Sequence, residues 1–162
     1  MAKLTHVDGR GRASMVDVGG KQASARVAVA RGRISMNAEA FEALAANRLA
    51  KGDALAVARL AGVQAAKRTA DWIPLCHSVP LDDLQVAIEL DDEARRAVVT
   101  ATASARWVTG VEMEALVAVS AACLALYDMA KAVDRAMTIG DIELLRKSGG
   151  RSGDWSREPR GG

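Results

Sequence analysis

The chain is poor in aromatic residues. Its 162 residues include one phenylalanine, one tyrosine and three tryptophans, so aromatic side chains make up only 3% of the sequence. Because half of the residues are hydrophobic, the core must consist mainly of alanine, valine and leucine, which lets helices and sheet pack closely. The scarcity of aromatic rings also disfavours a nucleic-acid-binding domain, which would stack bases on them.

Cysteine, histidine and net charge are scarce as well. The two cysteines, Cys76 and Cys123, are too few for a disulfide framework and suit a reducing compartment, with Cys123 a small core residue. Two histidines without any CxxC pair disfavour a structural zinc site. A net charge of +2 gives no electrostatic reason to expect nucleic acid as a partner.

Long uncharged apolar runs are also missing. The N-terminal stretch MAKLTHVDGRGR has no apolar signal-peptide centre, and acids and serine interrupt the longest apolar segment. We therefore expect a cytoplasmic protein with no membrane partner. The length suits one domain over 1–162, with a Gly- and charge-rich arm over 1–23 and a Gly-rich tail over 148–162, both of which we expect to be flexible and loosely structured.

Periodicity and turn residues predict the order of the helices and strands. The expected elements are a strand over 24–36, a helix over 38–48 capped by Asn37, a helix over 54–68 capped by Asp53, a stiff loop over 71–81, paired strands over 83–90 and 95–106, a long helix over 109–131 and a weak strand over 137–146. This order indicates an α+β fold, ferredoxin-like with one extra helix, with a mainly antiparallel sheet and helices packed on one face.

The helix over 109–131 carries charge only near its two ends. Glu112 and Glu114 stand in its first turn, and Asp128 and Lys131 stand in its last. Each end has a structural interpretation, because acids complement the helix dipole at its start and residues three apart form ordinary ion pairs. Glu114 and Asp128 point within roughly 40° of each other but lie ~21 Å apart along the axis. A small ligand that needs both ends would therefore require a second subunit.

Two other segments contain candidate site residues. In the loop Pro74-Leu75-Cys76-His77, His77 is either an acid, base or phosphate ligand, or a hydrogen-bonded structural residue. Lys51 precedes a helix N-terminus, where anions bind, and the basic glycine-rich run 147–153 can wrap phosphate although it lacks the P-loop order. Several cationic residues stand close to the ends of predicted helices and strands, and each is either a solvated surface residue or a ligand for an anion: Arg26, Lys51, Lys67, Arg68, Lys131, Lys147 and Arg151. Together they favour a small polyanionic ligand.

Six motifs in order resemble the molybdenum cofactor biosynthesis protein C (MoaC) family, the cyclic pyranopterin monophosphate synthases. They are MVDV (15–18), KGD (51–53), AAKRTADWIPLCH (65–77), TGVEMEAL (109–116), YDMAKAVDRAM (127–137) and KSGGRSGDW (147–155). The resemblance extends from Leu4 to Trp155. It implies a ferredoxin-like α+β fold that works without a metal or organic cofactor. It also implies a homohexamer, built as a trimer of dimers with active sites at the dimer interface.

The resemblance further implies a reaction. Members of the family convert 3′,8-cyclo-7,8-dihydroguanosine 5′-triphosphate, which a radical enzyme makes from GTP, into cyclic pyranopterin monophosphate with release of diphosphate. This is an early step of molybdenum cofactor (molybdopterin) biosynthesis. Asp128 corresponds to the catalytic acid or base, and Lys51 and Lys131 correspond to essential lysines, which act as acids or bases if desolvation or neighbouring cations depress their pKa. Substrate contacts are implied for Leu75, Cys76, His77, Met113, Glu114, Asp17, Arg26, Lys67, Glu112 and Lys147.

The chain departs from the common motifs at four positions: Trp107, Val108, where a basic residue is frequent, Ser78, where proline is usual, and Ala130, where YDMCK is common. The departures at 107, 108 and 130 motivate a competing hypothesis, an oligomeric nucleotide-binding or scaffold homologue that keeps the fold and is catalytically impaired. Substrate binding without product formation would favour it. A third hypothesis, a nucleic-acid-binding domain, would need an oligonucleotide affinity that falls with salt.

Overall fold

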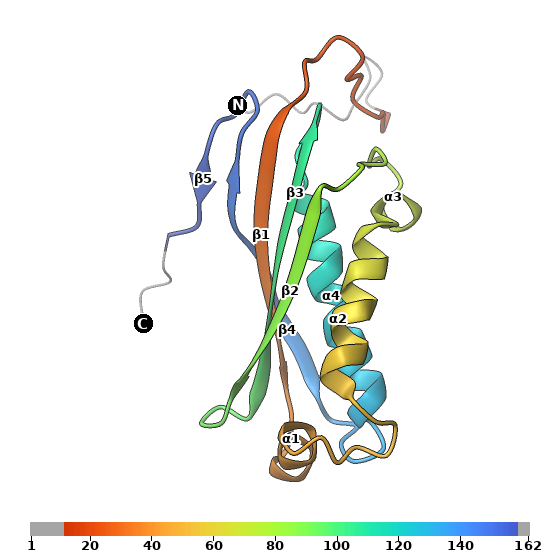
Figure 1. Ribbon diagram of the computed structural model, residues 1–162, viewed down its shortest axis with the longest axis vertical. Helices are drawn as coiled ribbons and strands as arrows, with labels where there is room; N and C mark the ends of the chain where they lie inside the picture. Colours follow the sequence, from red (N-terminus) through yellow and green to blue (C-terminus); the bar gives the residue numbers. More distant parts are fainter. Residues whose placement is uncertain (1–11, 159–162) are drawn as a thin grey trace.

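The computed structural model describes residues 12–158, which form one antiparallel sheet with helices on one face (Figure 1). The strands are β1 (Ser24–Ser35), β2 (Asp83–Asp91), β3 (Arg96–Trp107), β4 (Thr138–Ser148) and β5 (Trp155–Ser156), and the helices are α1 (Ala38–Ala45), α2 (Ala54–Ala66), α3 (Thr69–Trp72) and α4 (Glu112–Ala130). The strand order is β2-β3-β1-β4-β5, and every neighbouring pair is antiparallel. The predicted α+β class is confirmed, and the order β1–α2–β2–β3–α4–β4 agrees with a ferredoxin-like plan.

Two short elements, α3 and β5, are absent from the sequence prediction. α3 has four residues and no side-chain cap, and β5 pairs only two residues with β4. Elements this short carry no periodicity that a sequence pattern can reveal. Residues 1–11 of the predicted arm and 159–162 of the predicted tail lie outside the described residues. The flexibility expected of both segments stays a prediction.

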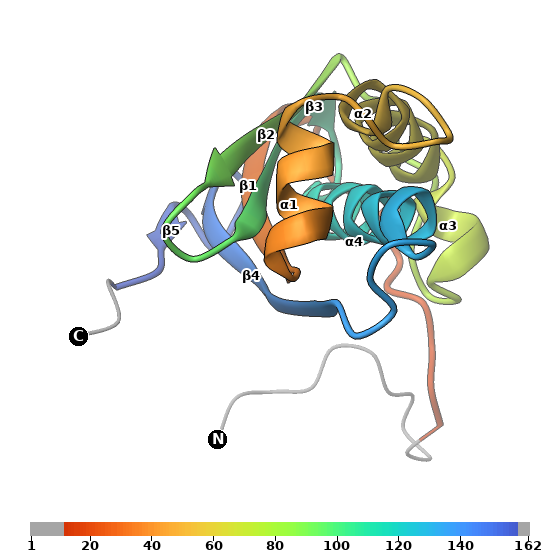
Figure 2. The ribbon, with the colours of Figure 1, turned by 90° about the horizontal axis from the view of Figure 1, so that it is seen from below.

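The core is built from small residues, as the composition predicts. On β1 the residues that face the helices are Ala28, Ala30 and Ile34, all fully buried, whereas Val27 and Val29 point to the other face of the sheet. α2 and α4 lie side by side on the helical face (Figures 1 and 2). They approach so closely that a Cβ at Gly62 would lie 2.9 Å from the Ala118 carbonyl oxygen. A glycine within a helix is tolerated here because it permits this contact.

α4 is the central helix of the fold. Within residues 12–158 it is the one helix long and apolar enough to span a membrane, but most of it is buried, as a core helix would be. α4 runs along the sheet, so that its first turn lies near α3 and its last turn lies near the loop between α1 and α2 (Figure 1). The charged residues at its two ends therefore belong to two separate regions of the chain.

Candidate active site

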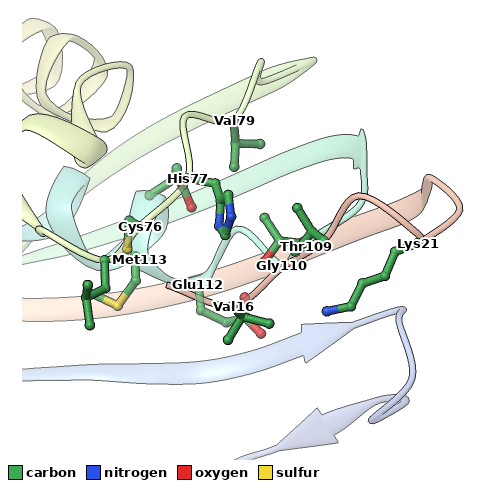
Figure 3. A pocket seen from close by; sticks show the side chains of 12 residues that line it. Val16, Lys21, Cys76, His77, Val79, Thr109, Gly110, Glu112 and Met113 are labelled. Atoms are coloured by element: carbon green, nitrogen blue, oxygen red, sulfur yellow. The ribbon is translucent and has the colours of Figure 1, made fainter. Parts of the chain in front are cut away.

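A cavity of about 340 Å³ lies at the beginning of α4 (Figure 3). Three segments distant in sequence form its wall, namely the arm before β1, the loop after α3, and the start of α4. The lining residues are Val16, Val18, Lys21, Leu75, Cys76, His77, Val79, Thr109, Gly110, Glu112, Met113 and Glu114. The lining combines apolar side chains with several ionisable ones, so the cavity can hold a small organic molecule and fix its orientation. Six of the predicted substrate-binding residues meet here: Leu75, Cys76, His77, Glu112, Met113 and Glu114.

Glu114 is the buried acid of this cavity. It is only 3% exposed, and burial raises its pKa from 4.5 to about 7, with the nearby charge of Glu112 adding to the shift. Glu112 itself packs over Gly110, where a Cβ would overlap its carboxylate. Glu114 also lines a second cavity of about 60 Å³ together with Lys67 and Ser78. A carboxyl group with a pKa near 7 can both donate and accept a proton at neutral pH.

Cys76 and His77 reach the same cavity from the loop after α3. The Cys76 backbone N–H donates to the Ile73 carbonyl oxygen at 3.0 Å and so closes a turn that presents both side chains. Burial raises the pKa of the Cys76 thiol, and the Glu114 carboxylate adds to this effect. The thiol is therefore protonated at neutral pH, which favours a binding role over a nucleophilic one.

The other end of α4 carries an ion cluster formed by Lys51, Asp128 and Lys131. The Lys51 ammonium donates to Asp128 Oδ2 at 2.6 Å and to the Asp128 carbonyl oxygen at 2.9 Å, and the Lys131 ammonium lies 2.8 Å from Asp128 Oδ1. The hydrogen bonds from Lys131 and Lys51 lower the pKa of Asp128 to about 2. All three side chains are about half exposed, so a ligand can reach them.

The condition under which Lys131 would act as a base, a depressed pKa, is not met in the isolated chain. The hydrogen bond and charge of Asp128 raise the pKa of Lys131 instead, because an adjacent carboxylate stabilises the ammonium form. At neutral pH the cluster therefore consists of an ionised carboxylate between two ammonium groups, with a net charge of +1. Such a cluster suits binding of an anion, and Lys131 can act only as a proton donor in this state.

The two ends do not meet within one chain. None of the three cluster residues lines the cavity that contains Glu114, and Glu114 and Asp128 are separated by fourteen positions of one continuous helix, about 21 Å. The structure thus brings the predicted site residues together as two groups, one at each end of α4.

The remaining predicted residues, Arg26, Lys147 and Asp17, do not line the first cavity. Arg26 donates through Nε to the Trp107 carbonyl oxygen at 3.3 Å and through a terminal nitrogen to the Val108 carbonyl oxygen at 3.4 Å. Lys147 donates to the Ser152 hydroxyl. Asp17 is exposed, accepts from the Gly19 backbone N–H at 2.9 Å and does not line the cavity.

Sequence reasoning missed several cavity residues. Val16 and Val18 belong to the MVDV motif of the arm, and Thr109 and Gly110 belong to the TGVEMEAL motif. Lys21 had no signal of its own, because it stands in a Gly-rich segment that we expected to be loosely structured. Among residues 12–158, no three His, Cys, Asp or Glu side chains gather closely enough to hold a metal ion.

Comparison with known proteins places this geometry in a family. The sequence profile of the MoaC family matches residues 15–150. The chain belongs to the MoaC family. It is 56% identical over 153 residues to a protein of Parvibaculum lavamentivorans, covering 94% of this chain and 96% of that one. It is 54% identical over 158 residues to a protein of Thermomicrobium roseum, covering 98% and 95% respectively. It is also 53% identical over 154 residues to a protein of Brucella ovis, covering 95% of this chain and 93% of that protein. All three relatives are named cyclic pyranopterin monophosphate synthase.

The departures from the common MoaC motifs fall outside the residues to which we assign chemistry. Ala130 is 1% exposed and belongs to the core. Ser78 lines the small cavity beside Glu114. Val108 contributes its carbonyl oxygen to Arg26, a contact that does not depend on its side chain.

Proposed function

We propose that this MoaC family member is a cyclic pyranopterin monophosphate synthase. It would convert 3′,8-cyclo-7,8-dihydroguanosine 5′-triphosphate to cyclic pyranopterin monophosphate and release diphosphate, in molybdenum cofactor biosynthesis. The observation that carries the proposal is the identity of 53–56% to relatives of that name over at least 94% of this chain. We propose a cytoplasmic location and a functional link to the radical enzyme that makes the substrate from GTP.

The two groups of residues at the ends of α4 fit different parts of this reaction. Ring opening and pterin closure require protons to be moved, and Glu114 has a pKa suited to this at neutral pH. Loss of diphosphate places negative charge on the leaving oxygens, which the ammonium groups of Lys51 and Lys131 would stabilise. Asp128 holds both ammonium groups in place. A phosphate that draws the lysines away would raise the pKa of Asp128 toward its usual value.

A complete site would then require two copies of the chain. The exposed side of α4 between its ends is largely apolar: Leu124 is 53% exposed, and Leu116 and Ser120 lie on the same side at four-residue spacing. A twofold axis beside Ser120, halfway between Met113 and Asp128, would place the Glu114 end of one helix next to the Asp128 end of the partner's helix. We propose this pairing as the dimer within a hexamer built as a trimer of dimers.

The proposal is tested by measuring diphosphate release from the cyclic dihydroguanosine triphosphate. We expect the unmodified protein to turn over, and Lys51→Ala and Asp128→Asn each to lose activity by about a hundredfold or more. Near-normal turnover in both variants would refute the assignment of the cluster. Tight substrate binding by the unmodified protein without any product would instead support the catalytically impaired homologue.

A further inference from the structure

We propose that the small cavity behind Glu114 holds water and carries protons between Glu114 and the solvent, with the Ser78 hydroxyl as a relay. The turn between α2 and α3, the loop after α3 and the start of α4 enclose this cavity of about 60 Å³. Its polar lining residues are Lys67, Arg68, Thr69, Asp71, Ser78 and Glu114. The proposal rests on the proposed function, because it supplies the proton that Glu114 exchanges with the substrate. Ser78 would act through Glu114 and not on the substrate itself.

Glu114 lies between two hollows of the structure. Glu114 and Val79 line both the 340 Å³ cavity at the start of α4 and the small cavity. Because Glu114 is only 3% exposed, its carboxyl group must exchange protons through one of these hollows. The ring system of the substrate would fill the large cavity and exclude water from that side. The small cavity then gives Glu114 a second connection to the solvent, since Lys67, Asp71 and Ser78 in its wall are exposed.

The size and the lining of the small cavity both suit water. A water molecule takes up about 30 Å³ in the liquid, so the cavity has room for about two. A buried water needs two to four polar partners, whereas an apolar cavity of this size stays dry. Six of the nine lining residues have polar side chains, and the other three are two alanines and a valine. The cavity can therefore hold a short chain of hydrogen-bonded waters.

Ser78 is the side chain in this lining best suited to pass a proton on. A relay must accept one hydrogen bond and donate another, as a hydroxyl group can. The ammonium and guanidinium groups of the lining only donate, and the Asp71 carboxylate only accepts. The Thr69 hydroxyl donates to the Ala66 carbonyl oxygen at 2.9 Å, so its own proton is already engaged. Ser78 is also a departure from the common MoaC motifs, so this hydroxyl distinguishes the chain from relatives with proline at that position.

The solvent balances the proton transfer. When Glu114 gives its proton to the substrate, its O–H bond breaks and a carboxylate remains. A water in the small cavity then donates a proton to this carboxylate and takes one from the Ser78 hydroxyl, which bulk water replenishes. One proton thus passes from the solvent to the substrate, and the reverse sequence removes a proton that Glu114 has accepted. The pKa of Glu114, raised by burial to about 7, permits both directions at neutral pH.

Other charged and titratable groups face the two hollows together with Glu114. They are Lys21 of the arm, Lys67 and Arg68 after α2, Asp71 of α3, Cys76 and His77 of the following loop, and Glu112 of α4. Each of them contributes to the electrostatic field at Glu114. Because Ser78 carries no charge, its replacement leaves these charges unaltered. A change in proton transfer after that replacement therefore reports the relay and not a change in the charge around Glu114.

Ser78→Val and Ser78→Thr form a matched pair, because valine and threonine have similar shapes and only threonine has a hydroxyl. We expect Ser78→Val to lower kcat for diphosphate release from the cyclic dihydroguanosine triphosphate about tenfold, as loss of one hydrogen bond would, with KM unchanged. Ser78→Thr should restore kcat. The solvent deuterium isotope effect on kcat should increase in Ser78→Val alone, which a merely structural role would not cause. Equal kcat values and equal isotope effects in the two variants would overturn the relay.

A crystal structure of the unmodified protein tests the water without turnover. We expect about two ordered waters in the small cavity, one of them within hydrogen-bond distance of the Glu114 carboxyl group. A dry cavity in a protein that releases diphosphate would refute the proton route and leave the proposed function standing. Ordered waters at Glu114 in a protein that releases no diphosphate would refute the proposed function alone, since the path from Glu114 to the solvent would remain.

Discussion

Replacement of Glu114 by glutamine should make the fold more stable as it makes the site less active. Burial raises the pKa of Glu114 from 4.5 to about 7, so the folded protein binds this proton more tightly than the unfolded chain does. A raised carboxyl pKa contributes stability at low pH, and this contribution is lost as the pH rises from about 4.5 to about 7. Ionised Glu114 thus destabilises the native state by about 3 kcal/mol above that window.

The magnitude can be tested as a difference between two pH values. With these pKa values, the gain in unfolding free energy from Glu114→Gln should be about 2.5 kcal/mol larger at pH 8 than at pH 5. Urea denaturation at one fixed protein concentration measures it, because subunit association also contributes to stability. Glu39→Gln is the control, because it replaces an exposed acid in the first turn of α1 and so gives the baseline for neutralising a surface carboxylate. A gain for Glu114→Gln that is equal at both pH values would refute the buried, proton-binding carboxyl.

Two other substitutions and one labelling experiment test the packing, the interface and the core thiol. Gly62→Ala should lower the unfolding free energy by about 1–3 kcal/mol, because the added Cβ meets the Ala118 carbonyl oxygen. The control Gly140→Ala should lower it less, because its Cβ meets nothing within 4 Å. Denaturant melts compare the two variants, and equal losses of unfolding free energy would contradict the close contact between α2 and α4. Leu124→Asp should raise the dimer dissociation constant about a hundredfold or more, because the new charge would be buried in the interface without a partner. Analytical ultracentrifugation measures the constant, and an unchanged value would mean that the interface lies elsewhere. Cys123 is fully buried, and burial raises the pKa of its thiol to about 12. Iodoacetamide at pH 8 should therefore leave Cys123 unmodified in the folded protein. Rapid labelling of Cys123 would contradict its place in the core.

The longer elements were predictable because their residues repeat a clear pattern. Leu84, Val86, Ile88 and Leu90 alternate along β2 and face the helices, and Asn37 and Asp53 cap α1 and α2 through their side chains as expected. The orientation of β1 was harder to predict, since its core face consists of alanines between valines. Size did not identify the buried residues there, because the face packed against α4 carries small residues. At Gly32 of this face an added Cβ would lie only 2.5 Å from Val119 Cγ1.

The site was predictable as a set of residues but not as an arrangement. The two charged ends of α4 were evident from helical spacing, and the resemblance to the MoaC family supplied roles for them. The direction of the pKa shift of Lys131 was not evident, because it depends on the distance to Asp128 within a half-exposed cluster. The part played by Lys21 was also hidden, since only the fold brings the arm beside the start of α4.

Mixed subunits provide the most direct test of the central claim, a synthase whose site is shared between two chains. Glu114→Gln and Lys131→Ala proteins, each inactive alone, should recover about a quarter of the unmodified activity when mixed, unfolded and reassembled in equal amounts, because one site in four then contains both intact residues. Diphosphate release from the cyclic dihydroguanosine triphosphate is the readout. Recovery to that level is the predicted result, and a mixture that reassembles fully but stays inactive would contradict the shared site.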